Sequence, residues 1–328
     1  MTDSDAKDDG HVPVLATPFV EALCHRPDGV VVDATFGRGG HSRMVLERLS
    51  NQGRLIALDR DPEAVAYGQR LEREDARFRI VHAEFGDLGA VLAEMEVTAA
   101  DAVGFDFGVS SPQLDQQQRG FSFGGTGPLD MRMNPEMGAP LSSLLAKVNH
   151  SELTKIIREY GEERFAGRVA RTILEARDAG VLSSTTDLAE VITRALPAKA
   201  RHPKRHHGQT GRDRHPATRT FQGLRIWVND EYGQIARGLA SAMAALTPGG
   251  KLVAIAFHSG EDSRVRDIVE SHVHPCTCPP QFPICICHRV ADMAWTQKKP
   301  LRADAVELAH NPRARSAKLR IATKCYAT

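Results

Sequence analysis

The stretch from Gly29 to His41 constrains the fold of this chain more than any other, and reads G-V-V-V-D-A-T-F-G-R-G-G-H. Its β-branched residues predict a strand ending at Asp33, its glycines predict a loop, and the apolar-periodic segment 44–49 predicts a helix. Glycine lets a ligand approach the backbone, and the N-terminus of the following helix offers unpaired N–H groups. The stretch is therefore either a site for a nucleotide-like ligand or an ordinary strand-to-helix turn.

The alternation of strands and helices continues after this loop. Apolar strands are expected at 55–58, 78–81 and 102–105, and helices lie between them. This order predicts an α/β fold, a mostly parallel twisted sheet with helices on both faces. The residues Asp33, Asp59 and Asp106 each end a predicted strand. Ligands of such sheets bind beyond the carboxyl ends of the strands, so we expect these acids on the binding edge.

The strand pattern is interrupted in the middle of the chain. Between about Gln113 and Arg214, loops rich in Gly and Pro lead into helical patterns, which we interpret as an inserted helical subdomain. The α/β pattern then resumes with a helical stretch at 221–246, a strand at 252–257, a helix at about 262–270 and a strand at 317–323. The predicted division is 1–115 and 215–328 for the α/β domain, with 116–214 for the helical subdomain.

Composition narrows the class of protein. The 328 residues are 41% hydrophobic and 25% charged, the N-terminus is polar and acidic, and no apolar run is long enough to span a bilayer. We expect a cytoplasmic protein with no membrane partner. Six cysteines, four of them close together late in the chain, argue against a disulfide scaffold and for reduced thiols or a bound metal.

The position of Asp59 favours one class of nucleotide over another. It lies 22 positions after Gly37, where a dinucleotide fold places a carboxylate that accepts hydrogen bonds from a ribose diol. Enzymes of NAD and of adenosylmethionine both use such an acid. The dinucleotide fingerprint needs another glycine where this chain has Ser42, which weakens the NAD interpretation. The alternative role for Asp59 is to cap the helix that begins at Asp61-Pro62.

A second constellation, D-F-G-V-S-S-P-Q-L-D from Asp106 to Asp115, directly follows the fourth predicted strand. It loosely resembles the short catalytic loop of amino-group methyltransferases. An exocyclic base amine is a poor nucleophile because its lone pair is conjugated with the ring. Acceptors such as Asp106, Ser110, Ser111 and the Pro112 carbonyl could hold its hydrogens and favour the nucleophilic form. A turn capped by serines is the structural alternative.

Several ordered blocks together resemble the ribosomal RNA small subunit methyltransferase H family over nearly the whole chain. They are H-V-P-V-L at His11, D-A-T-F-G-R-G-G-H-S at Asp33, L-D-R-D-P at Leu58, D-F-G-V-S-S-P-Q-L-D at Asp106, R-G-F-S-F at Arg119, G-P-L-D-M-R-M at Gly127, Y-G-E-E-R-F-A at Tyr160, H-P-A-T-R-T-F-Q at His215, F-H-S at Phe257 and N-P-R-A-R-S-A-K-L-R at Asn311. The resemblance implies a class I Rossmann-like methyltransferase domain with an inserted helical substrate-recognition subdomain.

The resemblance also implies an activity, a cofactor and a partner. Members use S-adenosyl-L-methionine to methylate N4 of a cytidine in the decoding centre of 16S rRNA, within the small ribosomal subunit or its precursor. A homodimer is left open. Departures from the family pattern include Phe107 where leucine is usual, and Asn134 where aspartate is usual. The implied cofactor contacts are Gly39, Gly40, His41, Asp59, Phe85, Asp106 and Gln113.

Two other functions stay open at this stage. One is a cofactor-sensing, RNA-binding ribosome assembly factor, and the other is an NAD-type oxidoreductase. The basic stretch from Lys199 to Arg225 holds eight Lys/Arg against one acid, which favours phosphate binding over a merely solvated loop. Within it, the segment from Lys204 to Asp213 looks like an insertion relative to the family, with no assigned role.

The late cysteines allow two interpretations. The sequence P-C-T-C-P-P-Q-F-P-I-C-I-C-H contains paired C-x-C units that could form a tetrahedral zinc site. The spacing is tighter than the usual C-x₂₋₄-C, so reduced loop cysteines are favoured and we assign no metal ligand from the sequence. The residues concerned are Cys276, Cys278, Cys285 and Cys287. A Pro-Cys nucleophile at Cys276 would suit carbon-5 methylation, but it lies far from the Asp106 loop in the sequence.

Overall fold

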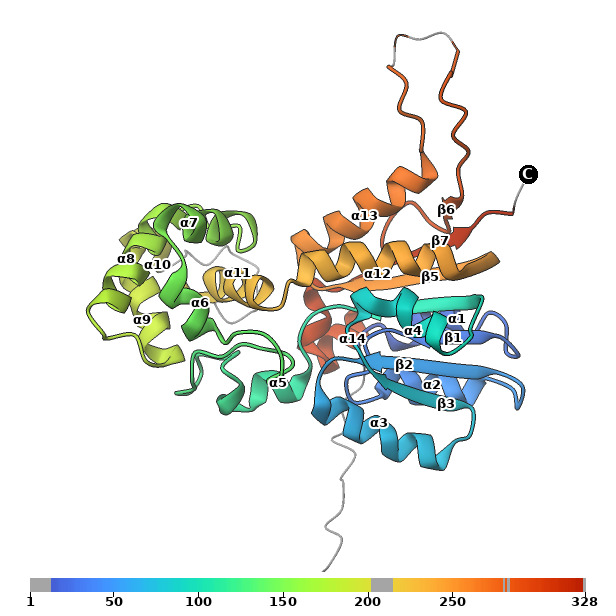
Figure 1. The fold of residues 1–328 in the computed structure, drawn as a ribbon, viewed down its shortest axis with the longest axis horizontal. Coiled ribbons are helices and arrows are strands. Elements are labelled where there is room, and N and C mark those ends of the chain that lie inside the picture. Colours follow the sequence, from blue (N-terminus) through green and yellow to red (C-terminus); the bar gives the residue numbers. More distant parts are fainter. Residues whose placement is uncertain (1–12, 202–214, 280, 282–283, 327–328) are drawn as a thin grey trace, which may run out of the picture. The chain divides into compact units, whose positions relative to one another are not determined.

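The computed structural model describes residues 13–201, 215–279, 281 and 284–326. The His11 end of the first family block and the Lys204–Asp213 segment lie outside the described residues. The chain divides into two compact units (Figure 1). The α/β unit comprises Met1–Gly108 and Tyr232–Thr328, and the helical unit comprises Val109–Glu231.

The α/β unit is built on a seven-stranded sheet in the order β3-β2-β1-β4-β5-β7-β6. Strands β1 to β5 run parallel, whereas β7 is antiparallel to both β5 and β6. The mostly parallel sheet predicted from the sequence is confirmed, and the three short apolar runs are strands in it. The bounds are β1 Val30–Asp33, β2 Arg54–Asp59, β3 Phe78–His82, β4 Ala100–Asp106, β5 Leu246–Ala256, β6 Met293–Trp295 and β7 Lys318–Lys324.

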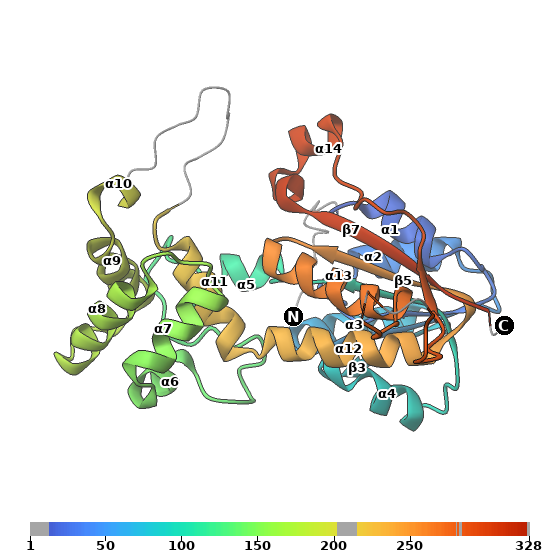
Figure 2. The same cartoon turned by 90° about the horizontal axis from the view of Figure 1, so that it is seen from above.

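Helices cover both faces of this sheet. Helices α1 (Ala16–Leu23), α2 (Gly40–Arg48) and α3 (Pro62–Glu74) pack on one face, where their apolar side chains form a single core with alternate residues of the strands. Helices α4 (Leu88–Glu94), α12 (Glu231–Ala245) and α13 (Ser259–Val273) cover the other face (Figure 2). Because both faces are covered, the central strands are mainly apolar between their ends, as parallel strands usually are.

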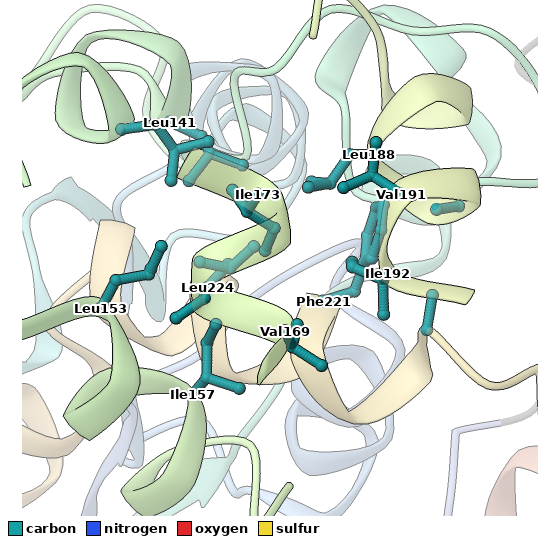
Figure 3. Close-up of a cluster of buried hydrophobic side chains, with 14 of the residues drawn as sticks. Leu141, Leu153, Ile157, Val169, Ile173, Leu188, Val191, Ile192, Phe221 and Leu224 are labelled. Carbon is teal, nitrogen blue, oxygen red and sulfur yellow. The ribbon is translucent and has the colours of Figure 1, made fainter. Parts of the chain in front are cut away.

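The helical unit has its own core. Apolar side chains from α6, α7, α8, α9 and α11 meet in it, among them Leu141, Leu153, Ile173, Leu188 and Phe221 (Figure 3). Asn149 and Ser184 cap α7 and α9 through their side chains, as expected for residues before helical patterns. The helices are α5 Ser111–Asp115, α6 Leu141–Lys147, α7 His150–Glu159, α8 Ala166–Asp178, α9 Thr185–Ala195, α10 Ala198–Arg201 and α11 Thr218–Val228.

The helix predicted at 221–246 is wrong as a single element. It is two helices, α11 and α12, separated at Asn229 and Asp230, where Asp230 has a left-handed φ of 48°. The Asn229 side chain accepts a hydrogen bond from Met133 N and donates one to Met131 O, both at 2.8 Å. These long-range bonds fix a chain break that carries no Gly or Pro signal.

The break also affects the boundary between the units. Sequence patterns place the boundaries after Asp115 and Arg214, whereas the compact units divide after Gly108 and Glu231. Helix α11 contributes Phe221 and Leu224 to the helical core, which explains its membership of that unit. Among the helices of the described residues, none combines the length and apolarity needed to cross a membrane.

Candidate functional site

Three aspartates lie on neighbouring strand ends of the α/β unit. In the parallel register, Asp33 of β1 is opposite Ala57 of β2 and Gly104 of β4. Asp59 and Asp106 are the last residues of those two neighbouring strands. The carboxyl ends of β2, β1 and β4 therefore present one acid each on a single edge, where ligands of such sheets bind.

Asp33 is a structural acid. Its side chain is buried, and its two carboxylate oxygens accept hydrogen bonds from Ser42 Oγ at 2.7 Å and Thr35 N at 3.1 Å. The pKa of Asp33 is raised by its burial, and these two bonds oppose the rise. Ser42 stands where a dinucleotide fingerprint would have glycine, and its fully buried hydroxyl ties the first turn of α2 to the end of β1.

The glycine loop adopts the backbone that its sequence predicts. Gly37 and Gly39 have left-handed φ values of 58° and 74°, and Gly39 is the N-cap of α2. A Cβ on Gly39 would lie 2.7 Å from the Phe36 ring, and one on Gly40 would lie 2.5 Å from the Pro13 ring. Larger residues at 39 and 40 would displace these neighbours, whereas at Gly37 the space is open. The loop is thus bare backbone leading into a helix N-terminus.

Asp59 holds this loop to the end of β2. One carboxylate oxygen accepts from Gly37 N at 2.7 Å and the other from Asp61 N at 2.8 Å. Burial raises the pKa of Asp59 to about 6. The cap of α3 is Asp61, whose side chain accepts from Glu63 N at 3.1 Å, so the alternative capping role belongs to Asp61. Each oxygen of Asp59 keeps a second lone pair for a ligand hydroxyl.

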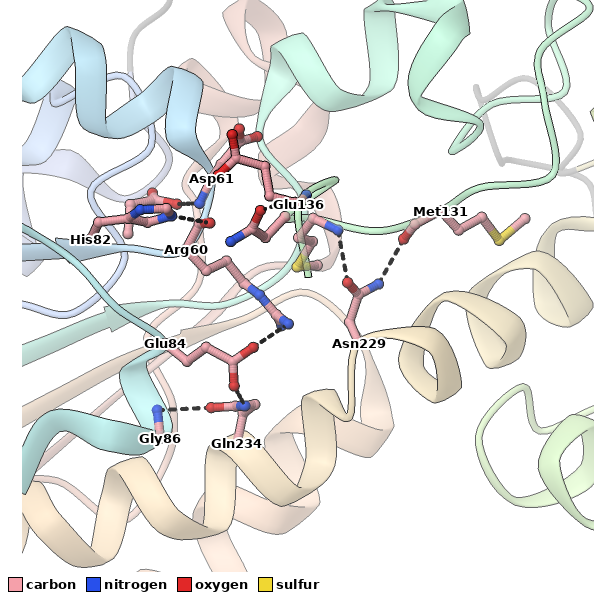
Figure 4. A network of polar contacts seen from close by, with 12 residues as sticks. Arg60, Asp61, His82, Glu84, Gly86, Met131, Glu136, Asn229 and Gln234 are labelled. Atoms are coloured by element: carbon pink, nitrogen blue, oxygen red, sulfur yellow. Dashed lines mark hydrogen bonds and ion pairs between the residues drawn. The ribbon is translucent and has the colours of Figure 1, made fainter. Parts of the chain in front are cut away.

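A polar network fixes the segment after β3. Figure 4 shows Glu84 between Arg60 and Gln234, paired with the first and hydrogen-bonded to the second. The Gln234 side-chain oxygen in turn accepts from Gly86 N at 2.9 Å. Phe85, between Glu84 and Gly86 in the sequence, is half-buried. Its ring centroid lies 5.8 Å from that of Phe105 and 5.6 Å from that of Phe107. The departure from leucine at 107 thus adds a ring to an aromatic cluster beside the edge.

Asp106 differs from the other two acids. Its backbone N–H donates to Thr35 Oγ1 at 2.6 Å, which joins β4 to the loop after β1. Its Oδ1 is buried and has no hydrogen-bond partner within the part of the chain that the structure describes. Its Oδ2 lies 3.6 Å from His41 Nδ1. Buried polar atoms in native proteins are almost always paired, so an orphaned carboxylate oxygen indicates a place for a ligand.

His41 is oriented by the backbone. Its Nε2 lies 3.1 Å from Val14 O, and its ring is 4.4 Å from that of Phe19. A carbonyl oxygen only accepts, so Nε2 carries the hydrogen and Nδ1 faces Asp106. The predicted cofactor residue His41 is therefore held between α1 and the orphaned acid.

Sequence reasoning singled out the F-H-S block but missed the acid that follows it. Glu261, in the first turn of α13, is buried; its Oε2 accepts from Phe257 N at 2.7 Å, and its Oε1 lies 2.9 Å from His258 Nε2. The pKa of Asp106 is raised well above its ordinary value by burial first and then by the charges of Asp33 and Glu261. A cluster of acids of this kind favours a cationic ligand, which would relieve their mutual repulsion.

The remaining candidates belong to the helical unit. Ser110 is the N-cap of α5 and forms a capping box with Gln113, whose side-chain oxygen accepts from Ser110 N at 3.0 Å. Ser111 and Pro112 open this short helix. The serine-capped turn considered from the sequence is thus present. It does not exclude a further role, because the hydroxyl oxygen and the Pro112 carbonyl keep acceptor capacity.

Comparison with known proteins matches residues 8–325 to the model of the MraW methylase family. The chain belongs to this family. The ribosomal RNA small subunit methyltransferase H of Heliobacterium modesticaldum is 45% identical over 96% of this chain and 98% of its own length. The protein of the same description from Geobacter sulfurreducens is 46% identical over 96% of this chain and 98% of its own. The resemblance noted in the sequence is confirmed.

Solved structures overlay less closely. An rRNA methylase from Streptococcus thermophilus covers 95% of each chain with a TM-score of 0.39 and 10% identity, so the fold assignment rests on strand order. Members of the MraW methylase family are S-adenosylmethionine-dependent methyltransferases, as predicted from the resemblance. The residues of the α/β edge fit that cofactor. Its sulfonium suits the acid cluster, and its ribose diol suits Asp59.

Proposed function

We propose that this protein transfers a methyl group from S-adenosylmethionine to the exocyclic N4 of a cytidine in the decoding centre of small-subunit rRNA. The observation that carries the proposal is the orphaned Oδ1 of Asp106, a buried acceptor at the end of β4. Relatives described as ribosomal RNA small subunit methyltransferases support the RNA substrate. The family resemblance supports N4 and the decoding centre.

Asp106 is the proposed acceptor for the target amine. When bound, the cofactor supplies the methyl group as an electrophile on sulfur. Asp106 would accept a hydrogen bond from the N4 amine. This bond would turn the lone pair of the amine nitrogen toward that methyl group. The N–C bond would form as the S–C bond of the cofactor breaks, and the extra proton on nitrogen would leave through the Asp106 carboxylate to water. Holding the amine in line accounts for much of the acceleration, and no covalent bond to the protein is needed.

The protonation state of Asp106 follows from its surroundings. Its pKa is raised in the protein alone, first by burial and then by Asp33 and Glu261. A cation beside it favours the carboxylate form. Binding of the positively charged cofactor would therefore lower the pKa of Asp106 and favour the carboxylate that the amine needs. Ser110, Ser111 and the Pro112 carbonyl are the further proposed acceptors for the second amine hydrogen.

The cofactor contacts are proposals of the same kind. The left-handed loop ending at Gly39 and Gly40 would receive the methionine end, since it offers bare backbone and a helix N-terminus. His41 would orient Asp106, Asp59 would accept the ribose hydroxyls, and Phe85 would contact the adenine ring. Gln113 is the remaining proposed contact.

RNA binding is proposed for the helical unit. Arg168 and Arg171 are exposed and three residues apart in α8, which places them on one face of that helix, and the exposed Arg164 lies just before it. Of the basic stretch Lys199–Arg225, the exposed described members are Lys199 and Arg219. Such cations neutralise phosphates and give salt-dependent affinity. The basic residues Lys318 and Arg320 near the C-terminus are expected to contribute less, because each pairs with Asp262 at 2.6 Å.

The decisive experiment offers purified protein and labelled S-adenosylmethionine both to small ribosomal subunits and to 16S rRNA that lack the modification. Nuclease mapping and mass spectrometry then locate the methyl group. We expect one methyl per RNA on N4 of a single cytidine. A label on a ring carbon or a ribose would refute the N4 assignment, and the two substrates show whether naked RNA suffices.

Failure of transfer to either substrate would favour the assembly-factor alternative, provided that the protein binds S-adenosylmethionine. The Asp106→Asn variant should still bind RNA, but at saturating cofactor it should transfer the methyl group about a hundredfold or more slowly. Asp178→Ala is the matched control, because Asp178 is an exposed aspartate at the end of α8. Full activity in Asp106→Asn would refute the proposed role of the orphaned oxygen.

A further inference from the structure

The segment between α13 and β6 leaves the body of the α/β unit. In Figure 1 the chain runs outward after α13 in one arm and returns to β6 in another. The base of the two arms is well bonded. Asp292 N donates to His272 O at 3.2 Å, His272 Nδ1 lies 2.8 Å from Asp292 Oδ1, and Lys324 Nζ lies 3.0 Å from Asp292 Oδ2. The two arms form a cysteine hairpin, residues 274–292.

The cysteine hairpin has no apolar core of its own. None of its described residues is buried, and its larger apolar side chains face solvent: Ile284 is 74% exposed, Ile286 63% and Val290 71%. A segment of this length gains too little from apolar burial to offset the entropy of ordering it. Some other interaction is needed to hold the arms together beyond their base.

Four sulfur atoms provide that interaction. The Sγ atoms of Cys276, Cys278, Cys285 and Cys287 all lie within 4.8 Å of one another. The separations from Cys285 are 3.6 Å to Cys276, 3.8 Å to Cys278 and 3.4 Å to Cys287, and Cys276 and Cys287 are 3.8 Å apart. Each arm contributes one C-x-C pair. All four are free thiols, not disulfides.

These separations match one coordination geometry. A zinc ion bound by four thiolates at about 2.3 Å in a tetrahedron sets its sulfurs about 3.8 Å apart. An iron–sulfur cluster would hold the sulfurs further apart, because its inorganic core lies between them. The cluster of thiols is therefore the size of a single tetrahedral ion.

Backbone N–H groups support the sulfurs. Ile286 N donates to Cys278 Sγ at 3.4 Å, and the backbone N–H groups of Thr277 and Arg289 hydrogen-bond to Cys287. Donors of this kind stabilise thiolates and orient them, as outer-shell partners do around bound metals. The tight C-x-C spacing, which weakened the zinc interpretation from sequence, is accommodated because the two pairs come from opposite arms.

We propose that Cys276, Cys278, Cys285 and Cys287 bind one structural zinc ion that fixes the cysteine hairpin. Four protein thiolates leave no open position for water or substrate, so the ion has no catalytic role. Soft thiolate ligands in a tetrahedron favour zinc over the hard divalent cations. The proposal is independent of the methyl-transfer activity and goes beyond it.

Metal analysis of protein purified without chelators tests the proposal. We expect one zinc per chain, which a mercurial should release by binding the thiols and a colorimetric zinc indicator should detect. The Cys278→Ser and Cys285→Ser variants should each lose most of the bound zinc. Cys24→Ser is the matched control, since Cys24 lies in the α/β unit and its sulfur contacts Val45 O at 3.7 Å; it should retain one zinc per chain.

Cobalt replacement provides an independent measurement on the folded wild-type chain. Cobalt bound to four thiolates gives intense visible bands typical of a tetrahedral site, with sulfur-to-metal charge transfer in the near ultraviolet. Limited proteolysis should cut within residues 274–292 only after chelation. Four reactive thiols with no metal, two disulfides by mass spectrometry, or stoichiometric iron in place of zinc would each overturn the assignment.

Discussion

The neighbouring strands β1 and β4 both end in an aspartate, yet the two carboxylates have different hydrogen-bond partners. Both oxygens of Asp33 are hydrogen-bonded within the fold, to Ser42 and Thr35. Asp106 has one oxygen with no partner among the described residues and another 3.6 Å from an imidazole nitrogen. The paired acid holds the loop in shape, and the unpaired acid is kept available for a ligand.

This difference gives a physical criterion for separating structure from function along one sheet edge. Leaving a buried acceptor unpaired costs free energy in the protein alone, on the order of 1–3 kcal/mol. A buried acceptor without a hydrogen bond inside the protein offsets this cost only when a ligand donates a hydrogen bond to it. Asp59 is intermediate, because its oxygens already accept from Gly37 N and Asp61 N but have lone pairs to spare.

The comparison predicts its largest effect at Asp106. Asp106→Asn should lower the rate of methyl transfer at saturating substrate about a hundredfold or more, since it removes an acceptor used in the transition state. The free energy of unfolding should change little, because Oδ1 accepts no hydrogen bond that the variant would remove. Single-turnover kinetics and urea denaturation measure the two quantities. A loss of stability without a loss of rate would make Asp106 a structural acid like Asp33.

The second effect concerns cofactor affinity and pH at Asp59. Asp59→Asn should weaken binding of S-adenosylhomocysteine about tenfold to a hundredfold, the usual scale for a hydrogen bond to a charged group. In the wild-type protein the affinity should increase as the pH rises from 5 to 7, because the pKa of Asp59 is about 6 and the carboxylate is the better acceptor.

The stability of the protein should respond to this pH range in the opposite direction. A carboxyl whose pKa is raised in the folded state stabilises that state at acid pH, and the contribution is lost as the pH rises through about 6. Calorimetric titrations with S-adenosylhomocysteine at several pH values measure the predicted change in cofactor affinity. An Asp59→Asn variant that keeps the full pH dependence would assign the titration to another group.

The third effect is on stability at the paired acid. Ser42→Ala removes the 2.7 Å hydrogen bond to Asp33 and leaves a buried carboxylate oxygen without that donor. The free energy of unfolding should fall by about 1–3 kcal/mol. Ser50→Ala is the control, because Ser50 donates to Asp28 in an exposed pair and its loss should cost less. Equal losses in urea denaturation would remove the distinction between the two serines.

Much of this edge was predictable from local sequence. The β-branched run predicts β1, and the glycines predict the loop after it. The aspartates at 33, 59 and 106 end predicted strands, which can be recognised because a strand pattern depends only on adjacent residues. The network around Asp106 was not predictable, since it joins residues far apart in the chain. Thr35 Oγ1 accepts a hydrogen bond from Asp106 N, and the charge of Glu261 comes from α13. Nor could the sequence separate a paired acid from an unpaired one.

Other features escaped prediction for the same reason. The break between α11 and α12 depends on Asn229 bonding to the distant Met131 and Met133. The three-residue strand β6 is too short to show a period, and it forms by pairing with β7. The cysteine spacing suggested loose thiols, because only the pairing of two arms brings four sulfurs together. Long-range contacts decided each of these points.

The smallest effect separates ligand-facing backbone from merely strained backbone within the glycine loop. Gly39→Ala and Gly37→Ala both place a methyl group at positive φ, and each should cost about 1 kcal/mol of stability from that source. Only at Gly39 does the new Cβ also meet the Phe36 ring, at 2.7 Å, whereas nothing lies within 4 Å of one at Gly37. Gly39→Ala should therefore lower the unfolding free energy further and shift Phe36.

The same pair of variants tests the cofactor contact. If the backbone at Gly39 faces the methionine end of the cofactor, Gly39→Ala should weaken S-adenosylhomocysteine binding more than Gly37→Ala, by about threefold to tenfold. Thermal shifts with and without the ligand separate the two contributions, because the ligand-induced shift depends on affinity and the shift without ligand on stability. Equal ligand-induced shifts would show that the cofactor does not contact the backbone at Gly39. Asp59 and Asp106 would then remain as the proposed contacts on this edge.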